Sequence, residues 1–356
     1  MNHALSLALR GTGQVSPNPR VGCVIVDNNE NIAEGWHAQF GGAHAEVAAL
    51  NALESHTGTR TLPPNAVVYV TLEPCSHVHK TPPCADALIA AGAGHVVVGM
   101  IDPFPLVAGR GIAMLREQGI VVDVGTCETS CAWMNRTFIK YVTTDTPYVV
   151  LKMAQTLDGF AAPLSRTRHT ITGTSSRARV HALRAEFDAV LVGIGTALAD
   201  DPMLTVRDVP GRNPVRVILD KRGALPSTSG LVQTARDVPT IVACSASNAT
   251  DNAAWITEIR SHGADVLLLD DDASLPSLLT QLGTRGIASV LCEGGARLAA
   301  ALMGQNLVDE LHIHIAPVAM GEGLHWMPAD QAIHWNLYTC ERIGDDVHLL
   351  LLPATS

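Results

Sequence analysis

The sequence predicts two α/β domains in one chain. At 356 residues the chain is long for one compact domain, and a hydrophobic content of 47% can supply sizeable, mostly aliphatic cores. Apolar, unbroken strand-like segments alternate with helix-like segments in two series, separated by the polar stretch TTDTP at 143–147. Such alternation is typical of a largely parallel sheet covered on both faces. We therefore expect one domain over residues 1–145 and a second over residues 146–356.

The first series alternates mostly apolar strands with helices, one of which is bounded by proline and glycine. The segment 82–94, for example, begins with prolines and ends with glycines, as helices commonly do. A polar turn at Asn28-Asn29-Glu30 joins the first two strands. We expect strands over 21–27, 31–36, 66–74, 95–100 and 120–124, and helices over 43–54, 82–94, 109–118 and 127–141.

The second series follows the same pattern and ends in β structure. Its helices are expected over 175–187 and 296–303. Its strands are expected to begin at 147 and to lie over 189–195, 215–220, 240–244, 265–270, 289–293, 312–318 and 346–352. These segments predict a second α/β domain with a core of its own.

Composition excludes several classes of function. A net charge of −10 and a pI near 5.8 argue against a general nucleic-acid binder, which needs a basic surface. The chain contains no apolar run of about 18 residues, so no membrane span is expected. The N-terminus shows no secretory signal. The eight cysteines are too dilute for a disulfide scaffold, and we expect a cytoplasmic protein with reduced thiols.

Two short motifs point to a metal centre. HAE at 44–46 opens a helix, and EPCSHVHKTPPC at 73–84 contains Cys75 and Cys84. One histidine, His44, and these two cysteines are three soft ligands for Zn²⁺, and the fourth position stays open for water, as a catalytic zinc requires. Glu46 can then carry the proton of that water to a leaving amine. The sequence predicts a catalytic zinc.

The spacing differs from a known signature, and other interpretations remain open. Zinc nucleobase deaminases combine H-x-E with P-C-x-x-C, whereas eight residues separate the two cysteines here. A structural zinc with His77 or His79 as fourth ligand, a disulfide loop, and a metal-free turn are the alternatives.

With these motifs the chain resembles the bifunctional pyrimidine deaminase–reductases of riboflavin biosynthesis. HAE, EPCSH and TPPC occur in that family in this order, and the long cysteine spacing belongs to it. Residues 17–22, PNPRVG, are similar to its PNPxVG segment, and residues 102–111, DPFPLVAGRG, to its DPxPxVxGxG loop. The resemblance covers nearly the whole length.

For the first half, the resemblance implies a cytidine-deaminase-like three-layer α/β/α domain. This domain would remove the 2-amino group of a diaminopyrimidinone phosphoribosylamine, a small-molecule substrate. His44, Cys75 and Cys84 would bind zinc and Glu46 would be catalytic. Asn18, His77 and Lys80 would contact the substrate; capping of the turn before Pro19 is the alternative role of Asn18. Lys80 stands where the family usually has arginine, and Phe104 replaces the usual asparagine of the DPNP loop.

Taken by itself, the second half offers weaker signals. Gly193-Ile194-Gly195 follows a strand, but the third position of a dinucleotide fingerprint is Leu198, so a Rossmann fold is not favoured. Glu293-Gly294-Gly295, between a strand and a helix, can cradle an anion because glycines allow close backbone approach. A plain tight turn is the alternative.

For this half, the resemblance implies a dihydrofolate-reductase-like α/β domain that uses NADPH to reduce the opened ribose to a ribityl chain. Arg184 and Arg207 would hold the ribose phosphate, and Leu204 and Glu293 would also contact the substrate. The residues that would bind the cofactor are Gln155, Thr170, Thr196, Asp200, Lys221, Gly294, Gly295, Ala296 and Arg297. A homodimer is expected from the resemblance alone.

The second half also departs from the family. Thr156, Arg168, Thr170 and Lys221 replace residues that are usually serine or, at position 170, tryptophan. These changes could alter nucleotide preference or weaken reduction, or Arg168 and Lys221 could supply new cations for a phosphate. The pair His312 and His314 has no third ligand nearby in the sequence, which favours a packing or surface role.

We predict a bifunctional enzyme in which zinc-dependent deamination is followed by NADPH-dependent reduction. One rival is a deaminase of another nucleotide, including tRNA, or a deaminase whose second domain only binds a nucleotide. The other rival is a binding protein with a structural zinc, in which the second domain senses a nucleotide.

Overall fold

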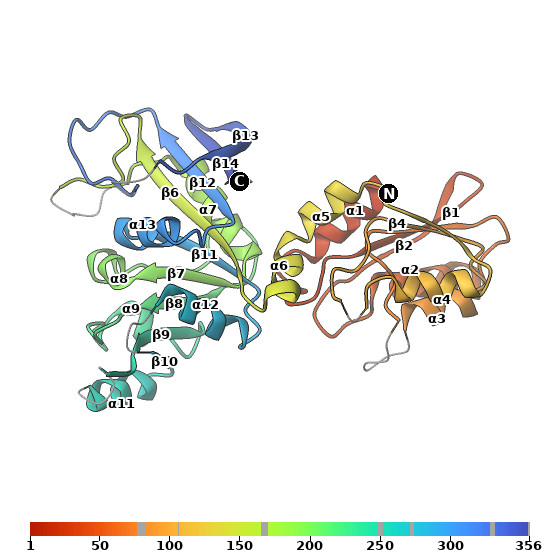
Figure 1. Cartoon of the computed structure of the whole chain (residues 1–356), viewed down its shortest axis with the longest axis horizontal. Coiled ribbons are helices and arrows are strands. Elements are labelled where there is room, and N and C mark those ends of the chain that lie inside the picture. Colours follow the sequence, from red (N-terminus) through yellow and green to blue (C-terminus); the bar gives the residue numbers. More distant parts are fainter. Residues whose placement is uncertain are drawn as a thin grey trace. The chain divides into compact units, whose positions relative to one another are not determined.

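A computed structural model divides the chain into two compact units, Met1–Asp145 and Thr146–Ser356. In Figure 1 the first unit runs from red to yellow and the second from yellow-green to blue. The structure describes residues 1–76, 83–105, 107–164, 170–247, 252–270, 274–327 and 332–354. Within them, no helix combines the length and the apolar character needed to cross a membrane.

The first unit is built on a five-stranded sheet of order β2-β1-β3-β4-β5. The strands are β1 (Gly22–Asp27), β2 (Glu30–Trp36), β3 (Val67–Val70), β4 (His95–Val98) and β5 (Val121–Val124). β1 is antiparallel to β2 and β3, and only β3, β4 and β5 are parallel. The sheet is thus mixed, not largely parallel as expected. The reason is local: Asn28 and Asn29 both have positive φ, which folds β1 back onto β2 as a hairpin.

Helices cover both faces of this sheet, which gives three layers. The helices are α1 (Asn2–Ala8), α2 (Ala45–Thr57), α3 (Cys84–Ala90), α4 (Arg110–Glu117), α5 (Glu128–Met134) and α6 (Arg136–Thr144). In Figure 1, α1 and α5 lie on one side of the sheet and α2, α3 and α4 on the other. Gly35 of β2 allows α2 to pack closely, because a Cβ there would lie 2.3 Å from the backbone nitrogen of Ala49. This close packing fixes the start of α2 against the sheet.

The single helix expected over 127–141 is in fact two helices that meet at Asn135. The Asn135 side chain accepts from the backbone N–H of Arg20 at 2.8 Å and donates to the Arg20 carbonyl at 3.0 Å. Asn135 is 1% exposed. These two bonds join the PNPRVG segment to the break between α5 and α6, and helical periodicity alone could not reveal them.

The second unit contains a nine-stranded sheet of order β10-β9-β8-β7-β11-β6-β12-β14-β13. The strands are β6 (Tyr148–Thr156), β7 (Ala189–Gly193), β8 (Val215–Leu219), β9 (Thr240–Ser245), β10 (Asp265–Leu269), β11 (Ser289–Gly294), β12 (Glu310–Ala316), β13 (Trp335–Ile343) and β14 (Asp346–Pro353). The first seven strands in this order, from β10 to β12, are parallel. β14 and β13 follow as antiparallel strands, and β13 forms the edge of the sheet. The parallel part therefore matches the expectation.

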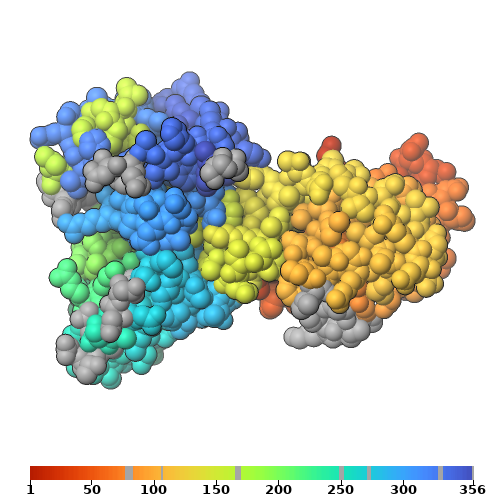
Figure 2. Space-filling view, in the orientation of Figure 1, coloured from red at the N-terminus to blue at the C-terminus, as the bar shows by residue number. Residues whose placement is uncertain are grey.

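β13 was not expected from the sequence. Its residues 336–342 are all exposed, so it lacks the alternation of buried and exposed positions that marks most strands. The strand exists because β14 offers it a free edge. The C-terminal strands lie at the surface of their unit, where they appear dark blue in Figure 2.

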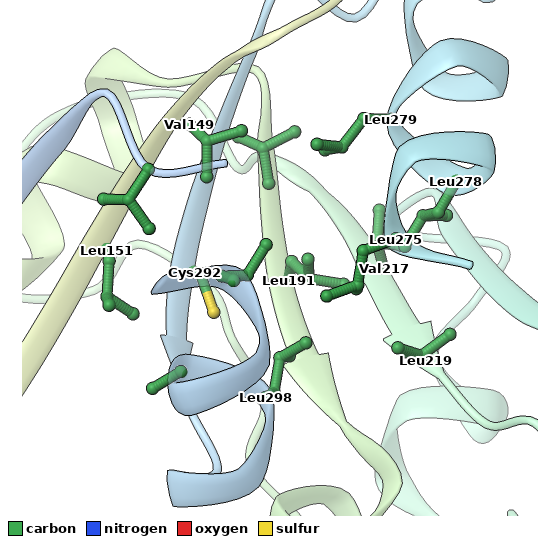
Figure 3. Packing of buried hydrophobic residues seen from close by; sticks show 14 of the residues in the cluster. Val149, Leu151, Leu191, Val217, Leu219, Leu275, Leu278, Leu279, Cys292 and Leu298 are labelled. Carbon is green, nitrogen blue, oxygen red and sulfur yellow. The ribbon is translucent and has the colours of Figure 1, made fainter. Parts of the chain in front are cut away.

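Helices pack on both faces of the nine-stranded sheet. The described helices of this unit are α7 (Thr174–Glu186), α8 (Ile194–Asp200), α9 (Gly230–Gln233), α11 (Ala253–Ser261), α12 (Leu275–Gly283) and α13 (Ala296–Gly304). Figure 3 shows the main core, where Leu278 of α12 and Leu298 of α13 pack on strand residues such as Leu191 and Cys292. Leu183 of α7 belongs to a separate cluster with Val150 and Leu291, whose side chains alternate with the core residues of the same strands.

Candidate functional site

Three elements of the first unit bring soft metal ligands together. His44 precedes α2 as its N-cap, Cys84 is the first residue of α3, and Cys75 lies in the segment after β3. His44 Nδ1 lies 3.6 Å from Cys75 Sγ and 3.3 Å from Cys84 Sγ. The ligand atoms all lie within 4.8 Å of one another, and no other group among the described residues could hold a metal in this way.

These distances fit zinc. Zinc–nitrogen and zinc–sulfur bonds at a tetrahedral angle would place the two ligand atoms roughly 3.6 Å apart. The backbone N–H of Cys84 donates to Cys75 Sγ at 3.2 Å, which holds the two cysteines in register. A hydrogen bond between the two thiols lowers the pKa of Cys75 to about 4 and raises that of Cys84. Three protein ligands leave one position for water or substrate, as in catalytic zinc sites.

Glu46 lies in the first turn of α2, beside the three ligands. Its side chain is buried, with 3% of the residue exposed. Burial, followed by the charge of Cys75, raises the pKa of Glu46 to about 7. A carboxyl group with a pKa near neutrality can both accept and donate a proton, which is what a shuttle between water and a leaving amine requires.

The DPFPLVAGRG loop is attached to the metal centre by Glu73, whose role the sequence did not reveal. Its buried carboxylate accepts backbone N–H bonds from Asp102, Gly109, Gly111 and Ile112, at 2.9 to 3.3 Å. Glu73 lies two residues before Cys75, so the loop and the metal segment form one structure. The one sequence feature that could have indicated this role is the position of Glu73 in EPC, directly before the proline and the zinc-ligand cysteine.

His37 is a second residue that sequence reasoning missed. It is 3% exposed, and its ring meets the ring of His44 edge-on, with centroids 5.5 Å apart. Its Nε2 lies 3.2 Å from Nδ2 of Asn18, the expected pyrimidine contact. Burial lowers the pKa of His37. The other two expected substrate contacts, His77 and Lys80, lie outside the described residues, as does Arg168.

The second unit contains a cleft of about 1540 Å³. It is formed where the parallel strands β6, β7, β8 and β11 end, which is where ligands bind in open α/β sheets. The expected reductase residues that line it are Thr170, Arg184, Thr196, Asp200, Leu204, Arg207, Lys221, Glu293, Gly294, Gly295, Ala296 and Arg297. The structure therefore brings nearly the whole expected set together.

Gln155 is the exception. Its side chain accepts a hydrogen bond from the indole of Trp326 at 2.9 Å, and it is not among the residues that line the cleft. Side chains alternate along β6, so Lys152 and Ala154 share one face and Gln155 points to the other. Its neighbour Ala154 lines the cleft instead.

Thr196 and the Gly294-Gly295 turn, which were both expected to bind the cofactor, lie next to each other. Gly294 and Gly295 have φ of 141° and 86°, which favours glycine. A Cβ at Gly295 would lie 3.2 Å from Thr196 Oγ1, so the first turn of α8 and the turn after β11 approach closely. α13 begins at Ala296, directly after these glycines. The arrangement suits a phosphate group held by backbone N–H groups at a helix start.

Arg184 and Glu293 form a buried, bidentate ion pair in this cleft. Arg184 donates from Nε at 2.5 Å and from its terminal nitrogen at 2.6 Å to the two carboxylate oxygens of Glu293. Its remaining nitrogen donates to the Thr205 carbonyl at 2.9 Å. Arg184 is thus largely engaged by protein groups, whereas Arg207 is exposed in the same cleft.

Lys152 of β6 is a further cleft residue that the sequence did not single out. Burial lowers its pKa, and the nearby charge of Glu293 opposes that effect. A lysine in the middle of the apolar stretch PYVVLKMAQ was a signal that could have identified it, because a charged group in such a strand needs a partner or a function.

The histidines His312 and His314 do have a third imidazole beside them, His348 of β14. His312 Nδ1 lies 2.9 Å from His348 Nε2, and His312 Nε2 lies 2.6 Å from Glu310. β12 and β14 pair His314 with His348 directly, although 33 residues separate them in the sequence. All three histidines are at most 1% exposed, which supports the expected packing role.

Comparison with known proteins identifies both units. The family described as "RibD C-terminal domain" matches residues 147–349, and the "Cytidine and deoxycytidylate deaminase zinc-binding region" matches residues 1–100. These matches confirm the cytidine-deaminase-like and dihydrofolate-reductase-like folds that the resemblance implied.

Relatives and solved structures agree over nearly the full length. The riboflavin biosynthesis protein RibD of Actinobacillus pleuropneumoniae is 40% identical, over 98% of this chain and 93% of its own. That of Aquifex aeolicus is 41% identical, over 91% and 88%. The structure of Acinetobacter baumannii RibD has a TM-score of 0.88 at 37% identity and covers 99% of this chain and 98% of its own. The Thermotoga maritima deaminase/reductase has a TM-score of 0.87 at 35% identity, covering 99% and 97%. The chain therefore belongs to the RibD family and combines a zinc-dependent deaminase with an NADPH-dependent reductase.

Proposed function

We propose that the substrate is 2,5-diamino-6-(5-phosphoribosylamino)pyrimidin-4(3H)-one. The first unit would hydrolyse its 2-amino group, and the second would reduce the ribose of the product to a ribityl chain. The proposal is carried by one observation, the convergence of His44, Cys75 and Cys84 beside the buried carboxyl of Glu46. The Thermotoga relative, whose name includes both activities, supports the choice of substrate.

In the deaminase, His44, Cys75 and Cys84 would hold the zinc. Zinc in this position supplies Lewis-acid activation of the attacking water. Glu46 takes a proton from that water while oxygen bonds to the ring carbon that bears the amino group. Glu46 then gives the proton to the amine, the C–N bond breaks, and ammonia leaves. The pKa of about 7 suits Glu46 to both transfers.

In the reductase, the glycine turn after β11 and Thr196 would hold the cofactor, which supplies the hydride. Arg207 is better placed than Arg184 for the ribose phosphate, because Arg184 is engaged by Glu293 and the Thr205 carbonyl. The Arg184–Glu293 pair would orient the sugar. Lys152 would hold the sugar oxygen that receives a proton.

Incubation of the zinc-loaded full chain with the diaminopyrimidine substrate, with and without NADPH, tests the proposal. We expect ammonia release in both reactions and NADPH oxidation only after deamination. Failure to release ammonia would contradict the deaminase assignment. Deamination without NADPH oxidation would show that the changes at Thr156, Thr170 and Lys221 have disabled the second activity.

We also propose that the chain works as a homodimer. The exposed edge strand β13 supports this, since Leu337 is 59% exposed and Tyr338 is 48% exposed. Exposed apolar residues on a free strand edge favour pairing with another chain. Light scattering during size-exclusion chromatography should give twice the chain mass, and a monomer at micromolar concentration would contradict the proposal.

We further propose that the protein acts in the cytoplasm on a free small molecule, not on nucleic acid. None of the eight cysteines forms a disulfide, which suits a reducing compartment. The net charge of −10 disfavours a phosphate backbone as substrate. Cell fractionation with an antibody against the chain would test the location.

A further inference from the structure

His37 is held in one orientation by its surroundings. Its backbone N–H donates to the Val21 carbonyl at 2.9 Å, and its ring Nδ1 lies 2.9 Å from the Ala43 carbonyl. Gly11 packs against the same backbone, because a Cβ there would lie 2.5 Å from the His37 carbonyl oxygen. The ring therefore has little freedom to turn.

The Ala43 contact determines which ring nitrogen carries the proton. A carbonyl oxygen only accepts hydrogen bonds, so Nδ1 must be the donor. In the neutral ring Nε2 then carries a lone pair and can only accept. Its neighbour at 3.2 Å is Asn18 Nδ2, an amide nitrogen, which donates. The bond is thus Asn18 Nδ2–H to His37 Nε2.

This bond removes the usual ambiguity of an asparagine side chain. The two ends of an amide are a donor and an acceptor of almost equal shape, and a flip exchanges them. With one N–H committed to His37, Oδ1 and the second N–H have defined positions. Asn18 itself is held between two prolines, and its backbone N–H donates to the Val15 carbonyl at 2.9 Å.

We propose that His37 is a positioning residue of the deaminase, which acts through Asn18. By accepting from Nδ2 it presents the Asn18 oxygen as an acceptor and the second N–H as a donor to the aminopyrimidinone ring. Such a ring offers donors and acceptors in a fixed order, so a flipped amide would set like groups against each other. The inference rests on the proposed role of Asn18 as a substrate contact. His37 also touches His44, so its effect on zinc must be separated from its effect on Asn18.

Two substitutions separate the two bonds of His37. In His37→Gln, the side-chain oxygen can lie where Nε2 was and accept from Asn18, but the bond to Ala43 is lost. In His37→Asn, the amide nitrogen lies where Nδ1 was and keeps the Ala43 bond, but the bond to Asn18 is lost. The proposal predicts that His37→Asn raises the KM for the diaminopyrimidine about tenfold, the worth of one hydrogen bond. His37→Gln should retain most of the affinity, and zinc content should stay at that of the wild type in both variants.

A purely structural role for His37 predicts the reverse order, because the Ala43 bond would then matter most. That order, or equal damage in both variants, would overturn the proposal. If His37→Asn does not fold, Asn18→Asp breaks the same bond from its other side, since a carboxylate cannot donate to Nε2. Because this variant also loses the N–H that Asn18 offers to the ring, KM should rise by at least as large a factor, with zinc content intact. An unaltered KM would overturn the proposal.

A double-mutant cycle completes the test on the full-length, zinc-loaded chain. Because His37 acts through Asn18, His37→Asn should have almost no further effect on KM in an Asn18→Ala background. Fully multiplicative effects would overturn the inference. An unchanged KM in Asn18→Ala alone would instead refute the role of Asn18. Absence of ammonia release from the wild-type enzyme would refute the proposed function, so the three failures are distinguishable.

Discussion

At the scale of single residues, two buried glutamates of the first unit have opposite environments. Glu73 accepts four backbone N–H bonds, so its charge is satisfied by the loop that it holds. Glu46 is buried without such a set of backbone donors, and its pKa rises to about 7. The first environment suits a carboxyl group that organises structure, and the second suits a group that exchanges protons.

Replacement of Glu46 by glutamine should abolish deamination without loss of metal. An amide cannot accept the proton of the attacking water, so we expect kcat for ammonia release to fall by at least about 100-fold. Zinc content, measured by atomic absorption, should be unchanged because Glu46 is not one of the clustered ligands. NADPH oxidation with the deaminated intermediate serves as the internal control. Retained ammonia release would contradict the assignment of Glu46.

Lys221 places a positive charge in the cleft of the second unit. It is exposed and lines the cleft next to Arg222 at the end of β8. If it faces the 2′-phosphate that distinguishes NADPH from NADH, Lys221→Ser should raise the KM for NADPH about tenfold and leave that for NADH unchanged. Arg236→Ser, at an exposed position outside the cleft, is the matched control. Equal effects on both cofactors would argue against a phosphate contact.

At the scale of elements, the metal centre depends on segments that are far apart in the sequence. His44 lies directly before α2 and Cys84 is the first residue of α3, while the loop before α4 is attached through Glu73. The break between α5 and α6 holds the PNPRVG segment through Asn135. The geometry of the site therefore depends on how these loops are attached to the sheet. Its motifs contain residues that hold loops in place as well as residues that bind the metal.

Glu73→Gln tests the anchoring of the DPFPLVAGRG loop. The amide nitrogen of glutamine would face backbone N–H donors, so some buried N–H groups would lose their acceptor. This loss should destabilise the closed loop by about 2 kcal/mol. We expect the amides of Gly109 and Gly111 to exchange hydrogen about 30-fold faster in the variant. Glu117→Gln, at an exposed position of α4, should leave these rates unchanged. Unaltered protection in Glu73→Gln would contradict the anchoring role.

At the scale of the whole molecule, buried histidines should make stability depend on pH. His314 is 0% exposed, and neither of its ring nitrogens has a partner among the described residues. Burial, then the charges of Lys152, His348, His312 and Arg179, lowers its pKa to about 2. The unfolded chain binds the proton near pH 6.5 and the folded chain does not. Stability is therefore complete above about pH 6.5 and falls as the pH decreases.

His314→Leu should reduce this dependence. Below the pKa of the unfolded state, one such histidine lowers the free energy of unfolding by up to about 1.4 kcal/mol for each pH unit. Leucine does not titrate, so the variant loses this contribution. Urea unfolding of wild type and variant between pH 7 and about pH 5 measures the slope. His334→Leu, at an exposed position in the same unit, is the control. An unchanged slope in His314→Leu would show that His314 is not the titrating group.

Much of this protein followed from its sequence. Apolar strands that alternate with helices predicted two α/β units, because the periodicity of apolar residues indicates which face of an element is buried. HAE and the two cysteines that follow prolines predicted a zinc deaminase, because few residue types can act as zinc ligands. The glycines at 294–295 predicted a phosphate site for the same kind of reason, the need for close backbone approach.

Only the tertiary structure decided which distant groups meet. The roles of His37, Glu73 and Lys152 all depend on contacts across elements. So do the divided helix at Asn135 and the Gln155 side chain, which bonds to Trp326 instead of lining the cleft. Local sequence carries no information on such contacts, since hydrogen bonds and ion pairs between side chains form only after strands and loops have been packed together. Residue chemistry could thus be predicted from the sequence, whereas the orientation of each group within its site required the packed fold.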